Sequence, residues 1–537
     1  MNKFVRIFLL LIVLTYVFIF CLFGLDLSDT FYWLNLYDKQ LESSMVVLTQ
    51  EIGSIILCAS QNLFDCGLLF FFRIVSFVVY VLAIIIPYVI LFSKQERCQY
   101  FYILLLTFLL MTPLFIFSPD VLTTISLSVI ISIFISWIKG KVDGLWICPL
   151  LGFISIISVF LRFPNILVIP ISLMLIIYVL YHKKYELKYS ICVLSLYVVS
   201  LVITYFLLAF LLDCNILMVG IESIFMNNNV GDASSHSTSN LFTRYMQSAI
   251  TIIVYMSVIT LLYQIGKLLN LYKDKKILSY LLILGIFVFV GYLLMNYVYA
   301  GNGYRNFKML LSAIIILACC NILFVTKESS KGLSMLVVLL MSIVQPLGSD
   351  TGLHKISAIL LCFLPFVYSS LKISLPKLYS LPIFSLFVLL TMYQNTKMFD
   401  DKRIHHLNST VSNVEELTGI HTTKDRACYI SNVLSEYDNM KNDSTQIVFY
   451  GHRSHIFNYL TSSEDISPSF YSGIEHICDV DKFVSKLKCR NYPVVFCTFY
   501  SPEEYSINDI NNSYFNVTLM ELGYKLHHCD SFDVYYQ

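Results

Sequence analysis

Two carboxylates, Asp26 and Asp29, follow the first apolar run of the chain, in the sequence LDLSDTFYW. If that run crosses a membrane, both lie at the membrane surface, close to anything embedded in the bilayer. A partly desolvated carboxylate there can act as a general base toward a hydroxyl group, or bind a divalent metal. The same segment can also begin a helix, with Ser28 or Asp29 as an ordinary N-cap. Spacing alone favours the cap slightly, and both interpretations stay open.

Cationic side chains occur in three later segments that fall between apolar runs. Arg162 lies in the short turn FLRFPN, where burying an arginine is costly unless an anion or a carboxylate meets it. Arg305 lies in AGNGYRN, and His354 and Lys355 close the segment GSDTGLHK. Arginine offers phosphate two parallel hydrogen bonds, and lysine offers a compact charge. The set predicts a site for the phosphate of a membrane lipid, although each cation alone could extend to ordinary headgroups.

The elements that must position these residues are long and apolar. Of 537 residues, 57% are hydrophobic and only 13% are charged, whereas a soluble protein is about one quarter charged. The apolar runs span roughly 16–25 residues, the length that crosses about 30 Å of hydrocarbon. This excludes a soluble enzyme, a disordered chain and a collagen-like chain. The predicted spans are 1–23, 68–93, 101–117, 121–137, 145–161, 164–181, 190–212, 246–264, 277–296, 307–325, 333–345, 356–371 and 378–394.

Basic residues orient these spans, about thirteen in number, because cytoplasmic loops are enriched in Lys and Arg. Alternate loops are basic here. They contain Lys94/Arg97, Lys139/Lys141, Lys183/Lys184/Lys188, Lys267/Lys273/Lys275/Lys276, Lys327/Lys331 and Lys372/Lys377. We therefore predict a multi-pass membrane protein with an uncleaved first helix, a cytoplasmic N-terminus and an extracytoplasmic C-terminal segment. A composition rich in Ile, Asn, Lys and Tyr favours a bacterial inner membrane.

The C-terminal domain, residues 395–537, differs in composition from the preceding chain. It holds 12 Lys and Arg against 19 Asp and Glu, a balance of −7, whereas residues 1–394 hold 24 against 16. The sequences TQIVFYG and YPVVFCTFY are typical of strands, and DVDKFVSKLKC between them is typical of a helix. We predict a small α/β domain outside the cytoplasm that folds separately from the transmembrane domain, residues 1–394.

Two further segments lie on the predicted outer side. Residues 25–61 carry helical periodicity and predict an amphipathic helix at the membrane interface. Residues 213–247 are polar and rich in small residues, which predicts a mobile loop. The sequence has no CxxC metal spacing, Walker A loop, Rossmann glycine fingerprint or GxSxG motif, and no nucleic-acid partner is expected.

These features resemble the GT-C superfamily of membrane glycosyltransferases, which includes the protein mannosyltransferases and the bacterial lipid A aminoarabinose transferases. The resemblance rests on the acidic loop LDLSDTFYW, the turn FLRFPNILVIP, the many spans and the terminal outer domain. The family usually has paired acidic residues, often adjacent Asp-Glu, whereas Asp26 and Asp29 are three positions apart. Asp29 matches the family's D-x-x-Y-like run better, and Arg162 matches its R-x-x-N arginine. Arg305, His354 and Lys355 match no motif.

The resemblance implies a polyprenyl-phosphate sugar as donor and a glycan, glycolipid or protein as acceptor, on the outer face. In the implied inverting transfer, Asp29 or Asp26 takes the proton of the acceptor hydroxyl as it attacks the anomeric carbon. The lipid phosphate leaves, and cations among Arg305, Lys355, His354 and Arg162 meet its charge. Activation on the cytoplasmic side then explains why the sequence has no nucleotide-binding loop. No cofactor is predicted, and the use of a divalent metal stays open.

Two other classes of membrane protein stay open. A flippase or transporter of lipid-linked oligosaccharide would carry ionisable residues near the membrane midplane, broken helices and internal repeats. The predicted spans have almost no charge at that depth, since Arg73 lies toward the outer end of its run. An O-antigen-type polymerase or ligase would use Arg and His in a large outer loop, and residues 213–247 contain His236 and Arg244.

Overall fold

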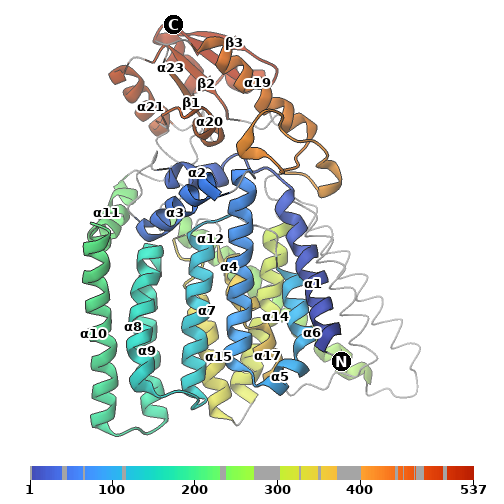
Figure 1. Ribbon diagram of the computed structural model, residues 1–537, viewed down its shortest axis with the longest axis vertical. Coiled ribbons are helices and arrows are strands. Elements are labelled where there is room, and N and C mark those ends of the chain that lie inside the picture. Colours follow the sequence, from blue (N-terminus) through green and yellow to red (C-terminus); the bar gives the residue numbers. More distant parts are fainter. Residues whose placement is uncertain are drawn as a thin grey trace.

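A computed structural model of the chain describes residues 3–38, 45–63, 67–111, 116–229, 238–270, 303–325, 328–348, 352–371, 401–441, 446–451, 453–464, 466, 477–490, 492–499 and 505–537. Long helices form a bundle, and the C-terminal domain lies over one end of it (Figure 1). We call this end of the bundle the domain-side end and the opposite end the far end.

Eight helices in the described part of the chain are long and apolar enough to cross a membrane, which makes this a multi-pass membrane protein. They pack side by side in the bundle, and α7 contacts both α4 and α8. Their bounds are α1 Lys3–Ile19 with its extension η1 Phe20–Leu22, α4 Leu68–Leu91, α7 Pro119–Ile138, α8 Gly144–Leu161, η2 Phe163–Leu167 with α9 Val168–His182, α10 Leu187–Leu211, α12 Thr238–Asn270 and α14 Gly303–Val325.

The sequence predicts about thirteen spans, whereas the described residues contain eight helices of sufficient length. The apolar helices α6 (Phe101–Leu110) and α15 (Ser329–Ser342) are too short to cross a bilayer alone, because a span needs about 20 residues. The predicted spans 277–296 and 378–394 lie outside the described residues. The short helix α5 (Lys94–Gln99) follows α4 at the far end.

The predicted span 356–371 is a bent pair of helices. Helix α16 (Ile356–Cys362) and helix α17 (Leu364–Ser370) meet at an angle of 69°. Pro365 lies in the first turn of α17, where its missing N–H and fixed φ suit a helix start but cannot continue the preceding helix. The turn η3 (Leu353–Lys355) precedes α16 and brings Lys355 to the domain-side end.

Two helices lie across the domain-side end, between the bundle and the C-terminal domain (Figure 1). They are α2 (Asp29–Tyr37) and α3 (Val47–Leu63), and they occupy most of the segment in which an interfacial helix was expected. The ring of Tyr37 stacks on Phe72 of α4 with 5.7 Å between ring centroids. The acidic segment therefore rests on the bundle through buried aromatic contacts.

The expectation of a mobile loop at residues 213–247 is wrong for the part that is described. Helix α11 (Ile216–Asn229) and the first turns of α12 occupy it, because the apolar sequence ILMVGIESIFM supports a helix. Residues 230–237, including His236, lie outside the described residues. Arg244 lies within α12.

The C-terminal domain contains a four-stranded sheet in the order β1-β2-β4-β3. The β1/β2 pair is parallel, and the β2/β4 and β4/β3 pairs are antiparallel. The strands β1 and β2 are fully buried, as their continuous apolar sequences predict. The elements are α19 Lys424–Met440, β1 Ile447–Tyr450, α20 Ser454–Thr461, α21 Ile477–Arg490, β2 Val494–Cys497, α22 Ile507–Asn511, α23 Tyr514–Glu521, β3 Lys525–His528 and β4 Asp533–Tyr536, with short turns η4 Ile404–His406 and η5 Glu415–Leu417 before them.

Two hydrophobic cores cover the two faces of this sheet. One lies within the domain and includes Tyr450, Phe483 and Phe515. The other is continuous between the domain and the membrane part, since it joins Phe449 and Phe457 to residues such as Phe31 of α2. The C-terminal domain is therefore built onto the end of the bundle and shares its core there.

The far end of the bundle carries basic residues that bind helix C-termini. Lys183 Nζ donates to the carbonyl of Trp137 at 2.5 Å, and Lys141 Nζ donates to the carbonyl of Leu91 at 2.9 Å. Cations are favourable at these carbonyl ends because they complement the helix dipole. The predicted basic loops at Lys139–Lys141 and Lys183–Lys188 thus lie opposite the C-terminal domain, as an alternating topology requires.

Candidate functional site

The carboxylate of Asp26 is buried and bound by its own loop, the acidic loop (Leu25–Thr30). Its Oδ1 accepts hydrogen bonds from the N–H and the hydroxyl of Ser28, both at 3.0 Å. Its Oδ2 accepts bonds from the N–H of Thr30 at 2.8 Å and the hydroxyl at 3.0 Å. Four donors fill the usual acceptor capacity of a carboxylate. Asp26, only 3% exposed, therefore starts helix α2 and is poorly suited to take a proton from a substrate.

Asp29 occupies a different position in the same loop. It is the first residue of α2 and is partly exposed, whereas all other residues from Gly24 to Thr30 are buried. Its Oδ1 lies 3.5 Å from the hydroxyl of Ser28. The capping role that the sequence left to Ser28 or Asp29 is filled by Asp26, and Asp29 is the more exposed carboxylate of this loop.

Arg73 of α4 fixes the backbone that leads into the acidic loop. Its Nη1 donates to the carbonyls of Cys21 at 3.1 Å and Phe23 at 3.0 Å, and its Nη2 donates to that of Gly24 at 2.6 Å. Gly24 has a φ of +82°, a left-handed conformation that favours glycine. Three carbonyl groups thus compensate the buried charge. They hold the connection between η1 and α2 against the bundle.

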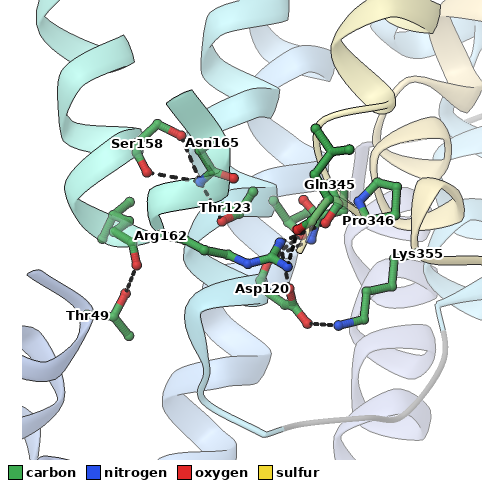
Figure 2. Close-up of polar contacts among 12 residues, drawn as sticks. Thr49, Asp120, Thr123, Ser158, Arg162, Asn165, Gln345, Pro346 and Lys355 are labelled. Carbon is green, nitrogen blue, oxygen red and sulfur yellow. Dashed lines mark hydrogen bonds and ion pairs between the residues drawn. The ribbon is translucent and has the colours of Figure 1, made fainter. Parts of the chain in front are cut away.

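A second polar group lies where α7 begins and α8 ends (Figure 2). Arg162 Nη1 is 3.2 Å from Asp120 Oδ1, and Lys355 Nζ is 2.5 Å from Asp120 Oδ2. The side chains of Asp120 and Lys355 are 28% and 23% exposed, and that of Arg162 is 8% exposed. One carboxylate therefore bridges two cations. Asp120 and Lys355 are the more exposed members of this group, and Arg162 is buried behind them.

The guanidinium of Arg162 also binds the segment between α15 and η3. Its Nη1 donates to the carbonyl of Gln345 at 2.8 Å, and its Nη2 donates to that of Leu347 at 2.6 Å. The amide of Gln345 in turn donates to the carbonyl of Asp120 at 3.0 Å. Arg162 is therefore a rigid, multiply bonded arginine rather than a mobile one on the membrane surface.

Asn165 holds the turn that carries Arg162. Its Nδ2 donates to the carbonyl of Ser158 on α8 and to the hydroxyl of Thr123 on α7, both at 2.9 Å. These bonds tie the ends of the two helices together (Figure 2). As a result, Arg162 and Asp120 are kept at the same level of the bundle.

The structure defines fewer contacts for the other predicted cations, His354 and Arg305. His354 precedes Lys355 in η3 and is buried. Arg305 lies in the first turn of α14, and its side chain lies outside the described residues. Lys355 is thus the cation of these three whose contact with Asp120 is defined.

Lys308, one turn further along α14 than Arg305, interacts electrostatically with Asp120. We call Asp120, Arg162, Lys308 and Lys355 the cation cluster. Two cations, Arg162 and Lys355, pair with the single carboxylate of Asp120, which leaves a surplus of one positive charge, and Lys308 lies nearby. Such a surplus near the end of a membrane bundle attracts an anion.

The α2–α3 unit connects the acidic loop with the cation cluster. The hydroxyl of Tyr37, the last residue of α2, donates to the carbonyl of Phe117 just before α7, at 2.9 Å. The hydroxyl of Thr49 on α3 donates to the carbonyl of Leu161, the last residue of α8, at 2.8 Å. Asp29 lies at the opposite end of α2 from Tyr37, about 12 Å away for a helix of this length. The aspartates and the cations thus form two groups at one end of the bundle.

Sequence reasoning missed Asp120, which organises the cations. An acidic residue directly after Pro119, at the start of an apolar run, is typical of an ordinary helix N-terminus and does not by itself indicate a site. The available signal was its position, since it is a carboxylate at the same membrane face as Arg162. The structure adds Asp120 and Lys308 to the residues expected at this end.

No group of three or more His, Cys, Asp or Glu side chains in the described part of the chain could hold a metal ion. The alternative in which the aspartates bind a divalent metal therefore gains no support from the residues whose positions are known. Comparisons with family models, with curated proteins and with solved structures find no match to this chain.

Proposed function

We propose that this protein is a membrane glycosyltransferase that moves a sugar from a polyprenyl-phosphate donor to an acceptor on the outer face of the membrane. The domain-side end is the outer face in this proposal, with the N-terminus in the cytoplasm and about thirteen spans of a GT-C-like fold in a bacterial inner membrane. The acceptor is a glycan, a glycolipid or a protein. The cation cluster, with its surplus of positive charge at the bundle end, is the observation that carries the proposal.

A lipid phosphate suits the charge and the depth of the cation cluster. A phosphodiester brings one negative charge, and the phosphate monoester released by transfer brings up to two. A cluster with surplus positive charge therefore interacts more strongly with the leaving group than with the bound donor, and such a preference accelerates a reaction. Lys355 is the more exposed of the two cations bonded to Asp120 and is the side chain that we assign to the phosphate.

Asp29 is the carboxylate that we assign to the acceptor. It takes the proton of the acceptor hydroxyl as the hydroxyl oxygen bonds to the anomeric carbon. The bond from that carbon to the phosphate oxygen breaks, and its electron pair stays on the phosphate.

The distribution of charge disfavours the flippase alternative. In the described part of the chain, the buried basic side chains of the bundle are Arg73, Arg162 and His354, and all three lie toward the domain-side end. A transporter of anionic lipid-linked sugars would instead need ionisable groups near the midplane. The polymerase or ligase alternative stays open, because Tyr245 of α12, next to Arg244, donates to the carbonyl of Pro346 at 2.8 Å and so brings this part of α12 to the segment that Arg162 binds.

The proposal is tested with the purified protein in lipid nanodiscs and a set of short-chain polyprenyl-phosphate sugars. Release of polyprenyl phosphate, measured by mass spectrometry, reports transfer or hydrolysis of the donor. Lys355→Gln should raise the KM for donor or slow its cleavage, whereas Lys188→Gln, at an exposed site of α10, should change neither. Loss of activity in Arg244→Ala together with full activity in Asp29→Asn would support the polymerase or ligase instead.

A further inference from the structure

The backbone before Asp26 is bound on one side by Arg73 of the bundle and on the other side by the C-terminal domain. Asp401 Oδ2 accepts a hydrogen bond from the N–H of Leu25 at 2.9 Å. Arg426 Nη1 donates to the carbonyl of the same residue at 2.7 Å. Two charged side chains of the C-terminal domain thus bind both backbone groups of one residue in the acidic loop.

This contact is buried and is completed by further bonds. The side chains of Asp401 and Arg426 are 0% and 6% exposed, and Arg426 Nε lies 3.8 Å from Asp401 Oδ1. The hydroxyl of Thr422 donates to Asp401 Oδ2 at 2.7 Å. Both charges have already lost their hydration, so moving either side chain would leave a buried charge without compensation. The pair therefore holds Leu25 in one position.

The neighbouring residues of the connection pair with the same domain through their backbones. The N–H of Gly24 donates to the carbonyl of His421 at 2.8 Å, and the N–H of His421 donates to the carbonyl of Leu22 at 2.8 Å. Phe23 and His421 form a parallel bridge, and their rings stack with centroids 5.3 Å apart. The segment from Leu22 to Leu25 is thus bonded like a short added strand.

A chain of contacts runs from this clamp to Asp29. The clamp fixes Leu25, the next residue Asp26 binds the N–H groups of Ser28 and Thr30, and those bonds define the first turn of α2. Asp29 is the first residue of that turn. A second contact holds α2 from the same side, because the amide of Asn35 donates to the carbonyl of His455 at 2.9 Å.

We propose that Asp401 and Arg426 are positioning residues for Asp29, so that docking of the C-terminal domain sets the geometry of the proton acceptor. This inference rests on the proposed function. A base displaced by about 1 Å can lose roughly 100-fold in rate. Loosening the clamp should therefore lower kcat while leaving donor binding at the separate cation cluster intact.

The test uses full-length protein in nanodiscs with Asp401→Asn and Arg426→Gln. Asp425→Asn and Lys424→Gln are matched controls, because both side chains are exposed at the start of α19, next to Arg426. Hydrogen exchange followed by mass spectrometry reads the amides of residues 24–30. We expect exchange there to accelerate at least about tenfold in the two clamp variants, with no change in α10 or in either control.

The kinetic readout separates positioning from general loss of structure. Clamp variants should lower kcat about 10–100-fold with the KM for donor changed less than about twofold. Arg426→Lys, which keeps a charged donor, should recover part of kcat and serves as the milder variant if Arg426→Gln does not fold. Accelerated exchange with unchanged kcat, or unchanged exchange, would overturn the inference.

Failure of the proposed function can be told apart from failure of the clamp. If the wild-type protein transfers no sugar from any donor, the proposed function and the positioning of a base by Asp401 and Arg426 fall together. The exchange measurement then still decides whether the C-terminal domain fixes residues 24–30. If the wild type is active and the variants exchange normally, only the clamp is wrong.

Discussion

Arg162 and Asp120 join α8 to α7 through an ion pair of 3.2 Å at the domain-side end of the bundle. The same guanidinium binds the carbonyls of Gln345 and Leu347, which lie 183 and 185 positions along the chain. One side chain therefore brings together three segments that are distant in sequence. The position of Lys355 depends on this arrangement, because it binds the second oxygen of Asp120.

Replacing Arg162 should destabilise the folded protein strongly. Arg162→Met removes one cation from Asp120 and the donors from two carbonyls, and a hydrogen bond to a charged group contributes about 1.5–3 kcal/mol. The double variant Arg162→Met/Asp120→Asn should cost less than the sum of the single variants. Unfolding in detergent measures each value, with the exposed Lys188→Met of α10 as control. A melting temperature equal to wild type in Arg162→Met would contradict the assigned contacts.

The C-terminal domain should not be fully stable when expressed alone, in contrast to the expectation from its sequence pattern. One face of its sheet is covered within the domain, but Phe449 and Phe457 on the other face belong to a core shared with Leu25 and Phe31. A fragment of residues 401–537 should therefore bind an apolar fluorescent dye and self-associate in size-exclusion chromatography. A monomeric fragment that binds no dye would show that the shared core is dispensable.

The pH dependence of stability should contain a contribution from Asp533. Burial raises the pKa of its carboxyl above the ordinary 3.8, although Tyr505 and His528 hydrogen-bond to it. The folded state then holds this proton more tightly than the unfolded state, so stability falls as pH rises above about 3.8. Relative to Asp533→Asn, the wild-type melting temperature should decline between pH 4 and the raised pKa. The control is Asp530→Asn, at an exposed site, whose melting temperature should follow that of the wild type at every pH. A difference between wild type and Asp533→Asn that does not change with pH would contradict the prediction.

The orientation of the bundle is a prediction that reporter fusions can check. The basic far end should face the cytoplasm and the C-terminal domain should lie outside it. Alkaline phosphatase fused after Gln537 should be active, and a cytoplasmic reporter inserted at Lys275 should be active as well. Reversal of either result would move the acidic loop and the cation cluster to the other face, away from a donor used outside.

Several local elements could be predicted from the sequence because their patterns are short-range. The strands TQIVFYG and YPVVFCTFY appear as β1 and β2, and the helical periodicity after Leu25 appears as α2 and α3. Continuous or periodic apolar residues specify such elements directly. The membrane class followed from composition in the same way.

The arrangement of the candidate site could not be predicted, since it depends on long-range contacts and on hydrogen bonds within a loop. Spacing gave no means to pair Arg162 with Asp120, because each residue also suits a helix end. Spacing likewise could not decide between Asp26 and Asp29. The structure distinguishes the two through Ser28 and Thr30, whose N–H and hydroxyl groups occupy both oxygens of Asp26.

The most direct measurement is transfer from a polyprenyl-phosphate sugar by wild-type, Asp29→Asn and Asp26→Asn protein in nanodiscs. Asn cannot accept the proton, so Asp29→Asn should lose about 10²–10⁴-fold in kcat with an unchanged melting temperature. Asp26→Asn should instead melt at a lower temperature, because its amide nitrogen cannot accept the bonds that one carboxylate oxygen now receives. Wild-type transfer that persists in Asp29→Asn, or no transfer by the wild type, would contradict the proposed reaction.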